Sequence, residues 1–145
     1  LFALLRDRCG LSQTDAADLL NVRLDTVKSW ERRTNPNRAP EGVIAALRAL
    51  YRAMERAADE AVRLHRRSRA TEVTLYTGGR RFAEWPGGSG LAVLGMVAAR
   101  VDVPVTISPD AEHIEASLIA LATFWIISPS RLRGIMLLCL AELDA

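Results

Sequence analysis

The sequence has few of the residues that build disulfide frameworks and metal centres. Two cysteines and two histidines occur among its 145 residues. Cys9 and Cys139 lie far apart and form no CxxC pair, which is typical of reduced thiols in a cytoplasmic protein. His65 and His113 are isolated, whereas the ligands of a zinc site cluster at short spacing. We therefore expect no disulfide, no metal and no cofactor.

Membrane and export segments are also missing. Residues 1–8 already alternate apolar and charged side chains, so we expect no signal peptide. The most apolar stretch, residues 116–127, is about twelve residues long, whereas a helix needs ~20 residues to span a bilayer. Extending it across Pro129, Arg131 and Arg133 would be unfavourable. We therefore expect a cytoplasmic protein without a membrane partner.

Signs of enzymatic chemistry are weak. The glycine-rich segments 78–79 and 87–90 lack the Gly-Lys-Ser/Thr sequence of a phosphate-binding loop. The carboxylates at positions 110, 112 and 115 lie near a predicted helix start, where acidic residues are ordinary partners of the helix dipole. We therefore expect a binding protein rather than an enzyme.

The charge of the chain is unevenly distributed. Apolar residues make up 50% of the sequence, which is enough for a packed core. Residues 1–70 carry 14 Lys and Arg against 9 Asp and Glu, whereas residues 71–145 carry 5 against 8. The basic first half suggests a polyanion as its partner, and the acidic second half suggests contacts with protein.

Two short helices are predicted before residue 21. Apolar residues at helical spacing within residues 1–5 indicate the first helix, and Gly10 is a suitable end for it. Ser12 is a good N-cap, and Asp15 three positions later completes a short capping box. The second helix therefore runs over residues 13–20.

A sharp turn and a third helix follow. Asn21 tolerates the left-handed backbone conformation that such a turn requires. The third helix opens at Arg23 or Asp25 and ends near Arg33. Asn and Pro residues over positions 35–40 then indicate a loop.

A longer helix is predicted from Glu41 to about Arg67. Its apolar residues alternate at spacings of four and three, which is a heptad seam. The seam contains two alanines and is too thin for a free-standing coiled coil, so we expect its second half to pair with another helix, in this chain or in a partner. The seam residues are Val43, Leu47, Leu50, Met54, Ala57, Ala61 and Leu64.

The second half of the chain alternates short strands and helices. Strands are predicted over residues 72–76 and 103–107, and Pro104 favours an edge position for the latter. Helices are predicted over 91–101, 111–127 and 130–143.

The segment LSQTDAADLLNVRLDTVKSW, residues 11–30, carries the main functional signal together with Glu31. It resembles the Cro/CI-type helix-turn-helix of the XRE family of transcriptional regulators. The in-register matches are Leu11-Ser12-Gln13, Ala17, Leu20, Val22, Thr26-Val27 and Trp30-Glu31. Two departures from the family pattern are Asn21 in place of the turn glycine and Arg33 in place of a glycine that often ends the third helix.

The resemblance implies a set of DNA contacts. Residues that would read base edges are Leu24, Asp25, Lys28 and Ser29, of which Lys28 suits guanine, Asp25 suits cytosine and Leu24 suits a thymine methyl. Residues that would contact phosphates are Gln13, Arg23, Arg32 and Arg38. Arg6 and Glu31 match family positions that form an ion pair, and Trp30 matches a structural apolar position.

The segment VTLYTGGRRFAEW and the residues up to Ile107 faintly resemble the dimerisation domain of anti-CRISPR-associated repressors. Dimerisation is also expected physically, because two recognition helices ~34 Å apart read a palindrome. Predicted dimer contacts are Leu75, Tyr76, Leu118, Leu121, Phe124, Trp125 and Leu138.

The sequence thus predicts a mainly α fold in two parts. Residues 1–67 would form a five-helix Cro/CI-type helix-turn-helix domain, and residues 68–145 a small α+β dimerisation module. The predicted function is a homodimeric repressor that binds an inverted repeat in double-stranded DNA. Two alternatives remain open at this point: an antitoxin whose second half binds a toxin protein, and a regulator whose second half binds a small molecule.

Overall fold

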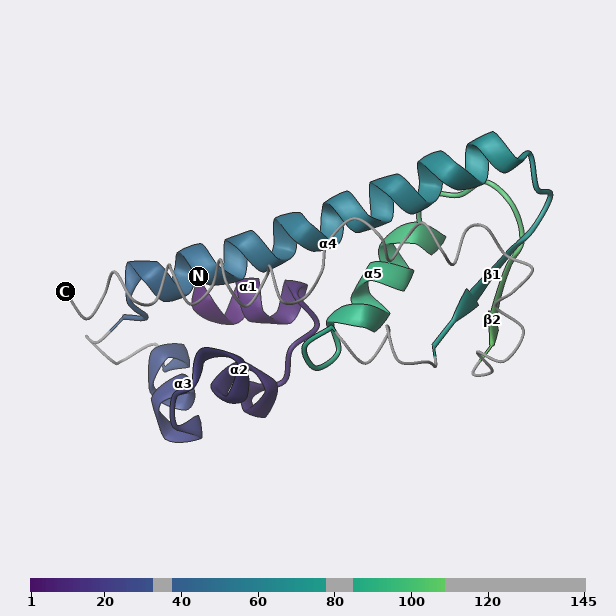
Figure 1. The fold of residues 1–145 in the computed structure, drawn as a ribbon. Helices are drawn as coiled ribbons and strands as arrows, with labels where there is room; N and C mark the ends of the chain where they lie inside the picture. Colours follow the sequence, from purple (N-terminus) through teal and green to yellow (C-terminus); the bar gives the residue numbers. More distant parts are fainter. Residues whose placement is uncertain (33–37, 78–84, 109–145) are drawn as a thin grey trace.

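The computed structural model describes residues 1–32, 38–77 and 85–108 of the chain. This part is mainly helical, with five helices and a two-stranded parallel sheet. The long helix α4 (Glu41–Ser68) runs along one side, and the other elements form two groups next to it (Figure 1). Helix α1 packs against its first half, with α2 and α3 on the far side of α1, and α5 packs against its second half, with the strands beyond α5.

The three short N-terminal helices are present where the sequence predicts them. They are α1 (Phe2–Arg8), α2 (Gln13–Leu20) and α3 (Leu24–Glu31). Helix α3 ends at Glu31 rather than near Arg33, because Arg32 has an extended backbone with φ −70° and ψ 124°.

Helix α4 confirms the predicted long helix. Six of its seven predicted seam residues are buried, and Leu64 is half-buried. The seam packs against other helices of the same chain, against α1 along the first half of α4 and against α5 along the second half. Intramolecular packing therefore accounts for the part of α4 that extends beyond the first three helices.

The remaining elements form a strand–helix–strand unit. Strands β1 (Val73–Tyr76) and β2 (Val105–Ser108) pair in parallel, with Val73 opposite Val105, and α5 (Ser89–Ala98) lies between them in sequence. Strand β2 begins two residues later than predicted, because Pro104 lies just before the ladder and contributes only its carbonyl, which accepts a hydrogen bond from the Val73 amide at 3.0 Å. Helix α5 begins and ends slightly earlier than the predicted helix over 91–101.

The expectation of five helices in the first domain is wrong for the residues that the structure describes. Four helices occur up to Ser68, because α4 continues for 28 residues without a break. No Gly or Pro occurs between Val43 and Ser68 to interrupt it. The predicted helices over 111–127 and 130–143 lie outside the described ranges.

Buried residues of both predicted parts belong to one continuous core. Phe2, Leu20 and Leu47 represent the first part, and Val73 and Val97 represent the second. The boundary near residue 67 therefore divides the described chain in sequence but not in packing. The role of the second part as a dimerisation module stays a prediction.

Candidate nucleic-acid interface

The start of α2 is stabilised by a complete capping box. The Ser12 hydroxyl accepts a hydrogen bond from the Asp15 amide at 3.0 Å, and the Asp15 carboxylate accepts one from the Ser12 amide at 2.8 Å. These bonds satisfy two backbone donors that a helix start leaves unpaired, an effect worth about 1 kcal/mol. They also hold the pKa of Asp15 below its ordinary value, because they favour the charged carboxylate.

The turn between α2 and α3 depends on Asn21. Its backbone is left-handed, with φ 52° and ψ 45°, which confirms the predicted turn conformation. The Val22 amide donates to the Ala17 carbonyl at 3.0 Å and closes the turn. Ala16 and Ala17 are buried, and their small side chains allow close packing around α2.

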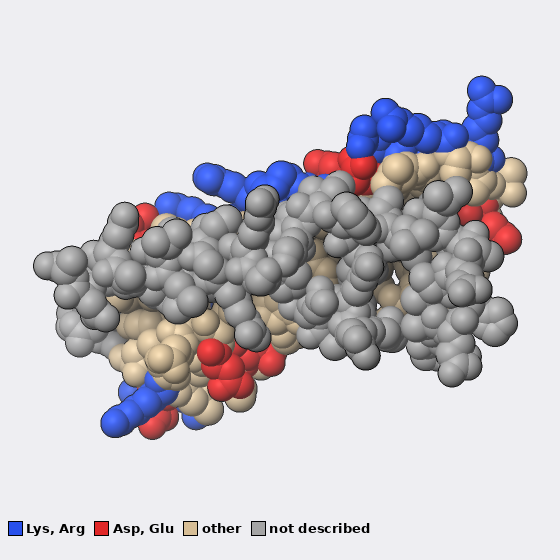
Figure 2. Space-filling model, in the orientation of Figure 1, with Lys and Arg blue, Asp and Glu red and all other residues tan. Residues whose placement is uncertain are grey.

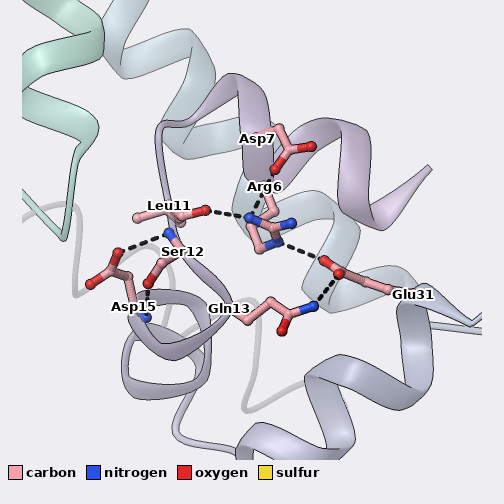
Figure 3. Close-up of polar contacts among 7 residues, drawn as sticks. All are labelled: Arg6, Asp7, Leu11, Ser12, Gln13, Asp15 and Glu31. Carbon is pink, nitrogen blue, oxygen red and sulfur yellow. Dashed lines mark hydrogen bonds and ion pairs between the residues drawn. The ribbon is translucent and has the colours of Figure 1, made fainter.

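Glu31, at the end of α3, is the centre of a polar network that joins all three short helices (Figure 3). The predicted ion pair with Arg6 is present, with Nε and Oε1 separated by 2.6 Å. The Gln13 amide nitrogen donates to the other carboxylate oxygen, also at 2.6 Å. Arg6 also donates through Nη1 to the Leu11 carbonyl at 2.5 Å and pairs with Asp7 at 2.8 Å. We call Arg6, Gln13 and Glu31 the brace.

The brace is largely shielded from water. Only 12% of the Arg6 side chain and 14% of the Glu31 side chain are exposed. Burial acts to raise the pKa of Glu31, but the hydrogen bonds from Arg6 and Gln13 and the charge of Arg6 outweigh it and hold the pKa below its ordinary value. The enclosed carboxylate of Glu31 fixes the orientation of α3. Moving α3 relative to α1 or α2 would separate this carboxylate from Arg6 or Gln13.

Helix α3 has one face in the core and one in solvent. Val27 is fully buried, and the Trp30 ring meets the Phe2 ring edge-on at a centroid distance of 5.3 Å. On the other side, Asp25 and Lys28 are exposed. The core and the brace therefore hold α3 from behind and leave a polar surface free.

The predicted DNA-contacting residues differ in how open they are. Asp25, Lys28, Arg23, Arg32 and Arg38 are exposed, and the first four lie on or beside α3. Arg38 follows directly after residues 33–37, which are not described.

Three other predicted contacts are partly used within the chain. Leu24 is half-buried and packs against the core. Ser29 is half-buried and already has an interaction within the protein. Gln13 donates its amide hydrogen to Glu31, so substituting it would disturb the brace as well as any phosphate contact.

A contact that the sequence does not predict joins α5 to the corner between α1 and α2. The Ser89 hydroxyl is fully buried and donates to the Cys9 carbonyl at 2.7 Å. Next to it, the backbones of Gly10 and Gly88 lie so close that a Cβ on Gly10, whose φ is +69°, would come within 2.8 Å of the Gly88 carbonyl oxygen. The glycines at 10 and at 87–90 are visible in the sequence as turn residues, but nothing in it indicates that they meet.

Of the predicted dimer residues, the structure describes two. Leu75 is 5% exposed and belongs to the core of the chain, and Tyr76 is half-buried. Leu118, Leu121, Phe124, Trp125 and Leu138 lie outside the described ranges. The dimerisation role of all seven stays a prediction.

The described residues contain neither a metal-binding cluster nor a helix able to span a membrane. No group of three His, Cys, Asp or Glu side chains there is placed to hold a metal ion. None of the helices in residues 1–32, 38–77 and 85–108 combines the length and the apolar character that crossing a bilayer requires. Cys9 is buried, and burial raises the pKa of its thiol to about 12, so the thiol is protonated at neutral pH.

Comparisons of the chain with protein-family models, with curated proteins and with solved structures found no match in any of the three.

Proposed function

We propose that this protein is a sequence-specific DNA-binding regulator that reads the major groove with α3. The observation that carries the proposal is the exposed polar face of α3, which the core and the brace support from behind. A groove ~12 Å wide admits one helix, and its base edges are read by side chains on a fixed helix face. The resemblance of residues 11–31 to the XRE family points to the same helix.

The exposed side chains on α3 suit particular bases. Lys28 can donate to the guanine oxygen and nitrogen acceptors, and Asp25 can accept from the cytosine amino group. Arg23 and Arg32, at the two ends of α3, are free to reach phosphates on either side of the groove. This division predicts that Lys28 contributes to sequence preference and that the two arginines contribute to general affinity.

A homodimer acting as a repressor on an inverted repeat is the form that we propose. One recognition helix reads few base pairs, so a second copy about one helical turn away along the duplex is needed for useful discrimination. A regulator of this type represses by covering a promoter, including that of its own gene.

The test is selection of bound sequences from a random duplex pool by the purified protein, together with its mass in solution. We expect a dimer that enriches an inverted repeat with half-sites about one helical turn apart. A protein that enriches no sequence at low salt would overturn the proposal, because even weak base readout produces enrichment over repeated rounds.

A further inference from the structure

A cluster of four arginines lies away from α3. A hollow of about 500 Å³ opens where the C-terminal ends of α4 and α5 meet. It is lined by Asp59, Val62, Arg63, Arg66, Arg67 and Arg100. Four of these six side chains are arginines. Figure 2 shows Lys and Arg side chains gathered along the outer side of this end of α4.

Within the described residues, two of these four arginines form ion pairs with carboxylates. Arg100 pairs with Asp59 at 3.0 Å, and Arg63 pairs with Glu60 on the preceding turn of α4. For Arg66 and Arg67 no ion pair is found in residues 1–32, 38–77 and 85–108. Both side chains are exposed, and the pKa of the Glu60 carboxyl group is lowered by its hydrogen bond from Arg63 and also by the charge of nearby Arg67.

The ends of the two helices explain part of this gathering. Each helix C-terminus carries roughly half a negative charge, which favours nearby arginines. Four arginines less the carboxylates of Asp59 and Glu60 leave two positive charges, and the two helix ends reduce this to roughly one. A surplus remains, and guanidinium groups from α4 and from the turn after α5 line one hollow.

We propose that this hollow binds a small phosphorylated ligand with at least two negative charges. The planar guanidinium group presents paired N–H donors that match phosphate oxygens. Arg66 and Arg67 would therefore hold the ligand, whereas Arg63 and Arg100 line the same hollow with their charges partly neutralised by Glu60 and Asp59. A volume of about 500 Å³ is within the range of small-molecule sites. We call this group of four arginines the anion site.

The position of the anion site separates it from a duplex bound at α3. Helix α4 has 28 residues and is therefore ~40 Å long, and the two sites lie toward its opposite ends (Figure 1). The anion site is thus separate from the surface that would read bases, and we assign it to the phosphate of a free small molecule, which competition with a duplex distinguishes from the phosphate of DNA. This proposal does not depend on the proposed DNA binding.

The test is calorimetric titration of the full chain with inorganic pyrophosphate, at constant ionic strength. We expect saturable binding of one ligand per chain, weakened at least tenfold by the double substitution Arg66→Ala with Arg67→Ala. The matched control is Arg52→Ala with Arg56→Ala, which removes two exposed α4 arginines that do not line the hollow. The control should bind as the unchanged protein does.

Three results would overturn the assignment. Absence of saturable binding would remove the site altogether. Equal weakening in both double variants would indicate attraction by net charge alone. Displacement of pyrophosphate by a random-sequence duplex would assign the arginines to nucleic acid instead. Thermal unfolding of both variants checks that they remain folded.

Discussion

The two halves of α4 fill their buried faces in different ways. The first half buries five large apolar side chains and two alanines on the side of α1, whereas the second half buries three alanines together with Val62 and His65 on the side of α5. Large side chains stabilise by filling volume, and small ones by allowing a neighbouring helix to approach. The buried large residues of the first half are Val43, Ile44, Leu47, Leu50 and Met54, and the buried alanines of the second are Ala57, Ala58 and Ala61.

The two halves of α4 therefore support two different surfaces of the molecule, the first by burying large side chains and the second by close packing of small ones. The first half positions the proposed recognition helix, and its end of the molecule also contains the brace. The second half positions α5 and the anion site. We expect the first half to be sensitive to loss of volume and the second half to gain of volume.

Leu47→Ala gives the largest expected effect. Leu47 is fully buried, so the substitution leaves a cavity and should lower the free energy of unfolding by about 3–5 kcal/mol. The control Leu4→Ala removes the same atoms from a residue that is 58% exposed. It should change the free energy of unfolding by less than ~0.5 kcal/mol. Chemical denaturation measures both, and equal effects would show that the first half does not depend on filled volume.

Glu31→Ala should come next, at about 2–3 kcal/mol, because it leaves the enclosed Arg6 with only Asp7 and the Leu11 carbonyl and leaves the Gln13 amide without its acceptor. The pH dependence identifies the cause. The pKa of Glu31 is lower in the folded state than its ordinary value of about 4.3, so its stabilising contribution is present above that pH and is lost as pH falls through the folded-state value.

We therefore expect the difference in unfolding free energy between the unchanged protein and Glu31→Gln to be full at pH 7 and to shrink below about pH 4. Denaturation curves at a series of pH values measure it. A difference that stays constant across this range would mean that the charge of Glu31 does not stabilise the fold.

Ala58→Leu tests the second half. Ala58 is fully buried, so the larger side chain should force the packing around α4 apart and lower the free energy of unfolding by about 1–3 kcal/mol. Arg52→Leu places the same side chain on the exposed side of α4 and is the control. If Ala58→Leu leaves the stability unchanged or raises it, the second half has spare volume and the contrast between the halves fails.

Two glycine substitutions sharpen the comparison and have the smallest effects. Gly88→Ala would press a Cβ against the Gly10 backbone and should destabilise the protein by roughly 1–2 kcal/mol. A Cβ on Gly95, within α5, meets no described atom within 4 Å, so Gly95→Ala should stabilise the protein by about 1 kcal/mol, because alanine favours helix. Thermal unfolding separates the two; the same sign for both would contradict a close contact at Gly88.

The features that the sequence predicts well are those set by neighbouring residues. The heptad seam locates α4 to within a residue at its C-terminal end, and the capping box and Asn21 locate α2 and its turn. Arg6 and Glu31 were expected to pair, but only through the family resemblance.

The features that it predicts poorly depend on residues far apart in the chain. Gln13 was expected to face a phosphate, yet it also donates to Glu31, which is 18 positions away. The bond from Ser89 to Cys9 spans 80 positions. Because such contacts follow from how helices pack and not from local pattern, no spacing in the sequence indicates them, and the same holds for the meeting of Arg100 with the end of α4.

The proposed reading of bases by α3 can be tested by measuring the affinity of Lys28→Ala for the selected duplex and for a scrambled one. We expect the preference for the selected sequence to fall by roughly 5- to 150-fold, which corresponds to about 1–3 kcal/mol for one base contact. The Arg52→Ala control should keep it. If Lys28→Ala retains the full preference while binding both duplexes more weakly, Lys28 contacts only the backbone and the account of α3 as the reading helix is contradicted.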